Sequence, residues 1–220
     1  MWSCSILEDM FYITGLPVDG SPIVCGEFNQ EKILEDMLGA DDPKRKGAYV
    51  SKEWLRKRFE KVREEDIQDE NTRTIWLQRY ARAYLLFLMG TILFPEKHKH
   101  TVFIGYLLFF TDLTPRVVQS FAWGAAVLAK LRDGFKQQTI KNGAVWILEM
   151  FLLERIPLLR KEYLKISEDT TSTQFPSVLH WSELMKNISA NMHLTLDWES
   201  LLDQTEGDMQ AAEISWRPYR

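Results

Sequence analysis

The stretch Phe121-Ala-Trp-Gly-Ala-Ala-Val-Leu-Ala129 indicates the fold class of this chain, because it combines small residues with bulky apolar ones. The small residues leave room for a neighbouring backbone, while Trp123 and the aliphatic residues supply packing volume. Glycine inside a helix costs about 1 kcal/mol relative to alanine, so Gly124 is expected to serve packing or function. A second apolar helix follows and ends at Glu154-Arg-Ile-Pro157. Both segments predict buried helices, and neither has the pattern of an active site.

The composition predicts a folded domain. A chain of 220 residues suits one domain, or one domain with a small appendage, and 45% hydrophobic with 12% aromatic residues excludes the disordered class. The formal net charge of −4 argues against a uniformly cationic surface for nucleic acid, although a local basic patch remains compatible with it.

Cysteine content and apolar runs indicate the compartment. Cys4 and Cys25 are too few for a disulfide framework and lack the spacing of a zinc site, which favours a reducing compartment. No positively charged start followed by an apolar run is present, so no signal peptide is expected. The apolar runs 83–94 and 102–110 are shorter than the roughly 20 residues of a bilayer span, so we expect no membrane segment.

Cap and stop signals predict a mainly α fold, a single multi-helix globular domain over residues 1–220 with a small N-terminal β-hairpin. The hairpin is expected within residues 14–26, with Asp19-Gly20 as its turn. Thr114-Pro115 is expected to begin the helix that carries residues 121–129. The polar segment 167–174 predicts a flexible loop. Other predicted helices cover residues 29–38, 51–63, 71–94, 102–113, 139–156, 182–192 and 197–204.

Several motifs, in order along nearly the whole chain, resemble the plant mobile domain. This helical domain is shared by transposon-carried genes and the maintenance-of-meristems proteins, and it is often labelled aminotransferase-like. Compared with the family, few residues precede the first motif, so a short or truncated copy is expected. As a second difference, no Trp-rich run precedes Glu154. The matching motifs are Thr14-Gly-Leu-Pro-Val-Asp-Gly20, Trp54-Leu55 with Phe59, the run from Arg82 to Phe94, Trp123-Gly-Ala-Ala-Val-Leu-Ala129, Glu154-Arg-Ile-Pro157 and Trp216-Arg-Pro-Tyr219.

The resemblance implies a non-catalytic interaction domain in the nucleus, or otherwise in the cytoplasm. It implies work in transposon silencing, genome stability and meristem maintenance, with a phosphatase-seven-like plant protein as partner. Among the family motifs, the residues expected in the core or tail are Trp123, Gly124, Trp216 and Tyr219.

A basic stretch supports an alternative function, a transposon-derived domain that binds DNA or chromatin through residues 44–63. Residues 44–46 also form a weak nuclear-localisation signal. The competing interpretation is a solvated helix face, balanced by the acidic residues from Glu64 to Glu70. The candidate contact residues are Lys44, Arg45, Lys46, Lys52, Arg56, Lys57, Arg58 and Lys61.

A polar clamp is expected where Glu154-Arg155 ends an apolar helix. An unpaired buried charge is expensive, so an inward-facing Arg155 needs a carboxylate or carbonyl partner. We expect Glu154 as the carboxylate and group Arg82 with this pair in one structural clamp.

The sequence favours no enzyme chemistry, so an unrecognised enzyme is the third hypothesis. An aminotransferase needs a Schiff-base lysine and a phosphate cup, and neither is identifiable. No cofactor or small-molecule substrate is predicted, because no matching motif is present. No metal site is predicted, because the pair His98 and His100 favours a solvated turn.

Overall fold

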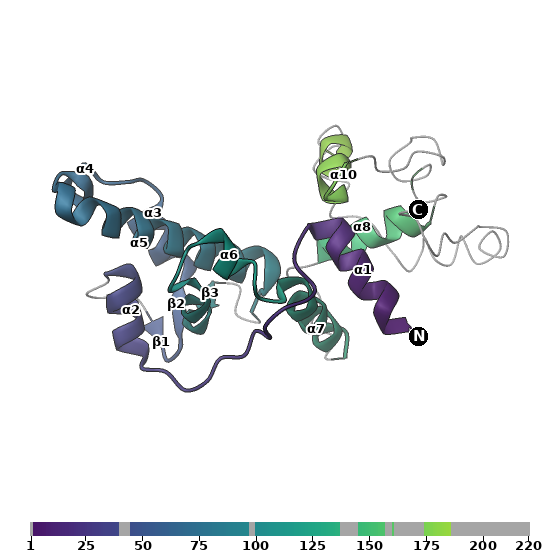
Figure 1. The fold of residues 1–220 in the computed structure, drawn as a ribbon, viewed down its shortest axis with the longest axis horizontal. Helices are drawn as coiled ribbons and strands as arrows, with labels where there is room; N and C mark the ends of the chain where they lie inside the picture. The colour runs from purple at the N-terminus through teal and green to yellow at the C-terminus, as the bar shows by residue number, and fades with distance from the viewer. Residues whose placement is uncertain are drawn as a thin grey trace. The chain divides into compact units, whose positions relative to one another are not determined.

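The computed structural model describes residues 2–39, 45–96, 100–136, 145–156, 160 and 174–185 (Figure 1). The chain forms two compact units. One unit combines Met1–Leu16 with Trp146–Arg220, and the other is Pro17–Val145. Each unit has its own buried residues, so each is described separately.

The longer continuous unit is organised around α5 (Glu70–Leu88), which packs against several other elements. Asp69 caps α5 by accepting from the backbone N–H of Asn71, and the helix continues into one π-helical segment, η1 (Met89–Leu93). The helices packed against α5 are α2 (Gln30–Leu38), α3 (Lys52–Phe59), α4 (Glu64–Ile67) and the 3₁₀ helix η2 (Ile104–Phe110).

Local capping explains where α2 and α3 begin and end. The side chain of Asn29 accepts from Glu31 and Lys32, and Gly39 ends α2 in the left-handed conformation at φ 61°. Ser51 accepts from Trp54 and begins α3. The predicted helices at 29–38 and 71–94 are confirmed as α2 and as α5 with η1, and the one predicted at 51–63 is confirmed but ends at Phe59. Residues 102–113, in contrast, form a short strand and then η2 instead of one α-helix.

A small antiparallel sheet, ordered β1-β2-β3, confirms the mainly α class with a minor β component. Its strands are β1 (Arg45–Lys46), β2 (Tyr49–Ser51) and β3 (Thr101–Phe103), with Val50 opposite Val102. The hairpin therefore forms at 45–51, and its prediction within 14–26 was wrong. Pro17 and Pro22 have no backbone N–H for a strand ladder. The segment instead makes one parallel bridge, between Ser21 and Phe121.

The stretch from Phe121 to Ala129 lies at the start of α7 (Trp123–Lys136), and α6 (Pro115–Val118) is separate. The predicted continuous helix from Thr114 was therefore wrong. Residues 119–122 break it, because their backbone bonds to another segment. Ser21 donates to the Ser120 carbonyl at 2.8 Å, and the Ala122 N–H donates to the Ser21 carbonyl at 2.9 Å.

The other unit contains α1 (Trp2–Thr14), α8 (Val145–Arg155) and α10 (Ser177–Met185). Its α1 and α10 pack together, and Pro176 lies against Gly15, whose φ is 71°. The main buried apolar residues of the unit are Met10, Ile13, Ile147, Met150, Leu153 and Trp181. The predicted tail helix at 182–192 overlaps α10. Residues 197–204 and the predicted loop 167–174, except Gln174, lie outside the described residues.

Candidate interaction face on α3, α4 and α5

The candidate face is built on α3, whose apolar side chains point to α5 and whose polar side chains, except Arg58 and the half-buried Lys52, are exposed. Leu55 is buried, and the ring of Phe59 lies 5.4 Å from that of Tyr80 in an edge-on arrangement. Trp54 contacts Phe59 at 5.9 Å between ring centroids. These aromatic contacts hold α3 on α5 and set which cations of α3 face solvent.

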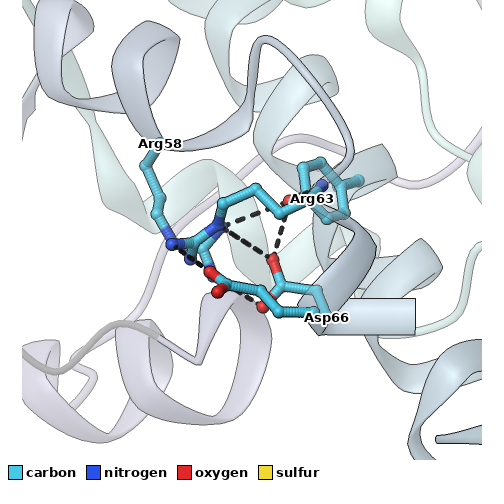
Figure 2. Close-up of polar contacts among 5 residues, drawn as sticks. Arg58, Arg63 and Asp66 are labelled. Carbon is cyan, nitrogen blue, oxygen red and sulfur yellow. Dashed lines mark hydrogen bonds and ion pairs between the residues drawn. The ribbon is translucent and has the colours of Figure 1, made fainter. Parts of the chain in front are cut away.

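A buried carboxylate joins α3, α4 and α5. The carboxylate of Asp66 accepts from Nη1 of Arg58 at 3.0 Å, from Nε of Arg63 at 3.2 Å and from the Tyr80 hydroxyl at 2.7 Å. Figure 2 shows Arg58, Arg63 and Asp66 converging. The Tyr80 hydroxyl also accepts from the backbone N–H of Arg63 at 3.0 Å. We call these four residues the Asp66 cluster.

The Asp66 cluster keeps its carboxyl group ionised. Burial alone would raise the pKa of Asp66, but hydrogen bonds from Tyr80 and Arg58, and the charges of Arg58 and Arg63, outweigh burial and lower it. The guanidinium of Arg58 also lies 4.9 Å from the ring centroids of both Phe59 and Trp76. Arg58 is thus held by a carboxylate and by aromatic faces at once.

The predicted basic residues therefore divide into used and available cations. Arg58 belongs to the Asp66 cluster, and Lys57 pairs with Glu53 at 2.6 Å. Burial lowers the pKa of Lys52, although the charge of Glu96 opposes this change. In the described part of the chain, Lys46, Arg56 and Lys61 are exposed and take part in no ion pair. Arg45 lies in β1, and Lys44 lies outside the described residues.

The acidic run after α3 contains one buried carboxylate. Glu64, Glu65, Asp69 and Glu70 are exposed, but Asp66 is only 8% exposed and accepts from Tyr80. The i,i+3 spacing of Arg63 and Asp66 was the one local signal of the Asp66 cluster. Tyr80 is 14 residues from Asp66 in sequence, so no local spacing predicts their hydrogen bond.

The predicted polar clamp is divided between the two units. Arg155 donates to Asp9, with Nη2 at 2.6 Å from Oδ1 and at 2.7 Å from Oδ2, and Glu154 accepts from Nε1 of Trp181 at 2.6 Å. Arg82 belongs to the other unit and donates to the backbone carbonyls of Phe110 and Thr111 at 2.8 and 3.0 Å. Asp9 was not predicted as a partner of Arg155, because 146 residues separate the two.

Two predicted family motifs meet at the start of α7. The Gly124 N–H donates to the Pro17 carbonyl at 2.7 Å, so Gly124 lies in the first helical turn beside a second backbone segment. Trp123 is 3% exposed, stacks on Phe110 at 5.6 Å and donates through Nε1 to the Val118 carbonyl. Trp216 and Tyr219 lie outside the described residues.

The described residues carry neither a metal-binding cluster nor a membrane-spanning helix. No group of three or more His, Cys, Asp or Glu side chains there is arranged to hold a metal ion. None of the helices in that part of the chain combines the length and apolar character needed to cross a bilayer.

The helices, the small sheet and the internal ion clusters define a mainly α-helical domain with a minor β component. A sequence model of the plant mobile domain matches residues 4–220. The chain belongs to the plant mobile domain family, which confirms the resemblance predicted from its motifs.

Relatives from Arabidopsis thaliana support this assignment. Protein MAIN-LIKE 2 is 27% identical over 221 residues, which are 97% of this chain and 31% of the relative. Protein MAINTENANCE OF MERISTEMS is 25% identical over 222 residues, 97% of this chain and 42% of the relative. Serine/threonine-protein phosphatase 7 long form homolog is 33% identical over 168 residues, 72% of this chain and 12% of the relative. The chain thus spans less than half of each relative. No solved structure matches it.

Proposed function

We propose that this chain is a non-catalytic protein-interaction domain that acts in the nucleus with a phosphatase-7-like partner. The observation that carries the proposal is the match to a protein named as a phosphatase 7 long form homolog. The matched segment makes up only 12% of that relative's length. There the domain is covalently joined to a much longer protein, which keeps the joined parts at high effective concentration. When the domain and the phosphatase-7-like protein are separate chains, binding of one to the other brings them equally close.

The use of the buried charges supports the non-catalytic part of the proposal. A general acid or base must reach the proton that it transfers. Asp66, Asp9 and Glu154 are instead buried and engaged by Tyr80, Arg155 and Trp181. Their partners join separate helices, which is the arrangement of a structural clamp.

The names of the relatives support the proposed biological setting. Two of them are named for the maintenance of meristems or for similarity to that protein. From these names we extend to meristem maintenance, and from the family resemblance to transposon silencing and genome stability in the nucleus. The chain matches less than half of each of these two relatives.

Co-purification from plant nuclei tests the partner and the compartment together. We expect the tagged chain to be found in the nuclear fraction and to enrich a phosphatase-7-like protein, relative to an unrelated nuclear protein with the same tag. Binding of the two purified proteins, measured by calorimetry, then establishes direct contact. Exclusion from nuclei, or no enrichment and no direct binding, would count against the proposal.

The exposed cations favour a second candidate function, binding of DNA through the basic stretch. Lys46, Arg56 and Lys61 are available to phosphates, whereas Arg58 is held by Asp66. Charge reversal at Arg58 would break the Asp66 cluster. A loss of DNA binding in that variant would then be indistinguishable from a loss of fold.

A gel-shift assay tests this second function. If DNA binds, the affinity should fall with salt, and the double variant Arg56→Glu with Lys61→Glu should abolish the shift. The double variant Lys32→Glu with Arg116→Glu makes the same charge change at exposed positions on α2 and α6, and it should retain most of the binding. Absence of any shift at low salt would exclude DNA binding by the basic stretch.

A further inference from the structure

The outer face of α5 carries an apolar seam that no described element covers. Leu77 is 45% exposed and Tyr84 is 64% exposed, while Ala81 is exposed and Leu88 is half-buried. Ala83 lies two residues from Ala81 along the helix, and Leu86 lies two residues from both Tyr84 and Leu88, and they are buried in the core instead. Leu77, Ala81, Tyr84 and Leu88 are separated by four, three and four residues, the spacing of a coiled-coil seam. We call these four residues the α5 seam.

The α5 seam is complementary to itself when two copies of the helix run antiparallel. A two-fold axis between residues 82 and 83 places Leu77 of one copy opposite Leu88 of the other. The same axis places Tyr84 opposite Ala81, so the largest side chain of the seam meets the smallest. A two-fold interface requires this reciprocity, in which residue i contacts j and j contacts i.

The dipole of the partner helix supports the same register. Arg73 is exposed on α5, one turn before Leu77. In the antiparallel pair, Arg73 lies beside the C-terminal part of the other copy's helix, near residues 91 and 92. A helix C-terminus carries partial negative charge and is stabilised by a nearby cation. Ile92, 39% exposed, extends the apolar surface toward that end.

We infer that the α5 seam binds a second copy of this chain in an antiparallel, two-fold arrangement. A single pair of 19-residue helices offers a small interface. Stable interfaces bury about 1,200–2,000 Å² in total, so this dimer is weak, with a dissociation constant on the order of micromolar or higher. Its central residue, Tyr84, is of a type enriched in the buried part of interfaces.

Sedimentation equilibrium of the full chain over a range of micromolar concentrations tests the inference. The wild type should show reversible dimerisation, and Tyr84→Arg should weaken it at least about tenfold, which corresponds to about 1.4 kcal/mol. Ile75→Arg is the matched control, because Ile75 is 48% exposed on the same helix but two residues from Leu77. Residues two apart on a helix do not share a face, so this variant should dimerise as the wild type does.

Ala81→Leu distinguishes the proposed register from general hydrophobic association. Leucine and alanine are both strong helix formers, and residue 81 is exposed, so the fold should be kept, which circular dichroism checks. In the antiparallel register the larger side chain collides with Tyr84 of the other copy and weakens dimerisation. Stronger association of Ala81→Leu would overturn the inference. So would a monomeric wild type at all concentrations, or equal loss of dimer in Tyr84→Arg and Ile75→Arg.

Discussion

Asp9 in α1 and Arg155 at the end of α8 are 146 residues apart in sequence, yet the Asp9 carboxylate accepts from Nη2 of Arg155 at 2.6 and 2.7 Å. The two residues are only 2% and 6% exposed. Burial removes the water that would otherwise solvate these charges, and their mutual hydrogen bonds offset part of that cost. The pair therefore connects the two sequence segments of its unit.

Removal of the Asp9 charge should destabilise the unit strongly. We expect Asp9→Asn to lower the free energy of unfolding by about 3–5 kcal/mol, because the buried Arg155 guanidinium loses the charge of the carboxylate that accepts from it. Urea denaturation measures the change. The neighbouring variant Glu8→Gln alters an exposed carboxylate and should remain within about 0.5 kcal/mol of the wild type. Equal effects of the two variants would show that the pair does not stabilise the unit.

Asp66 should make the stability depend on pH in the acidic range. Its pKa is lowered in the folded chain, so the unfolded state takes up protons more readily as pH falls. The resulting stabilisation is complete above the unfolded pKa of about 3.9 and is lost as pH falls through the folded pKa. We expect Asp66→Asn to show a flatter loss of stability than the wild type when unfolding is measured below about pH 5.

The matched control for this pH dependence is Glu64→Gln. Glu64 is exposed in α4 and takes part in no ion pair among the described residues, so its removal should leave the wild-type slope. Identical slopes for the wild type and Asp66→Asn would contradict the role assigned to the Asp66 cluster.

Gly20 should tolerate no side chain. Its φ is 126°, and an added Cβ would lie 2.2 Å from the Ser120 carbonyl oxygen. We expect Gly20→Ala to lower the melting temperature and to cost at least about 1–3 kcal/mol, the usual cost of such a strained backbone. Gly26→Ala is the control, because its added Cβ meets no atom within 4 Å. If calorimetry gives both variants the same melting temperature, the bridge beside Ser120 is not required for the fold.

Trp123 should contribute mainly through packing. Trp123→Ala removes a buried ring stacked on Phe110 and should cost about 3–5 kcal/mol in urea unfolding. Trp123→Phe keeps an aromatic ring but leaves the Val118 carbonyl without its indole donor, so a smaller cost of about 1–3 kcal/mol is expected. An alanine variant no less stable than the phenylalanine variant would contradict this order.

Elements with local signals were predicted well. Asn29 and Gly39 mark the ends of α2, and Ser51 marks the start of α3, because a cap requires only residues within one turn of the helix end. The family could also be inferred from the sequence, because its motifs keep their order along the chain. Predictions that depended on distant backbone partners were wrong. The segment around Asp19-Gly20 has turn residues, but its backbone bonds to residues 120–122.

By itself, the sequence determined the mainly α class, the helix caps and the family, since these depend on residue types at short spacings. Only the tertiary structure decided which charges are structural and which are available. Arg56 and Arg58 are two residues apart on one cationic helix, and the sequence predicts both as candidate contact residues. In the folded chain Arg56 is exposed, while Arg58 binds Asp66 between aromatic rings. The physical reason is that a side chain's charge is exposed or compensated according to the elements packed against its helix face.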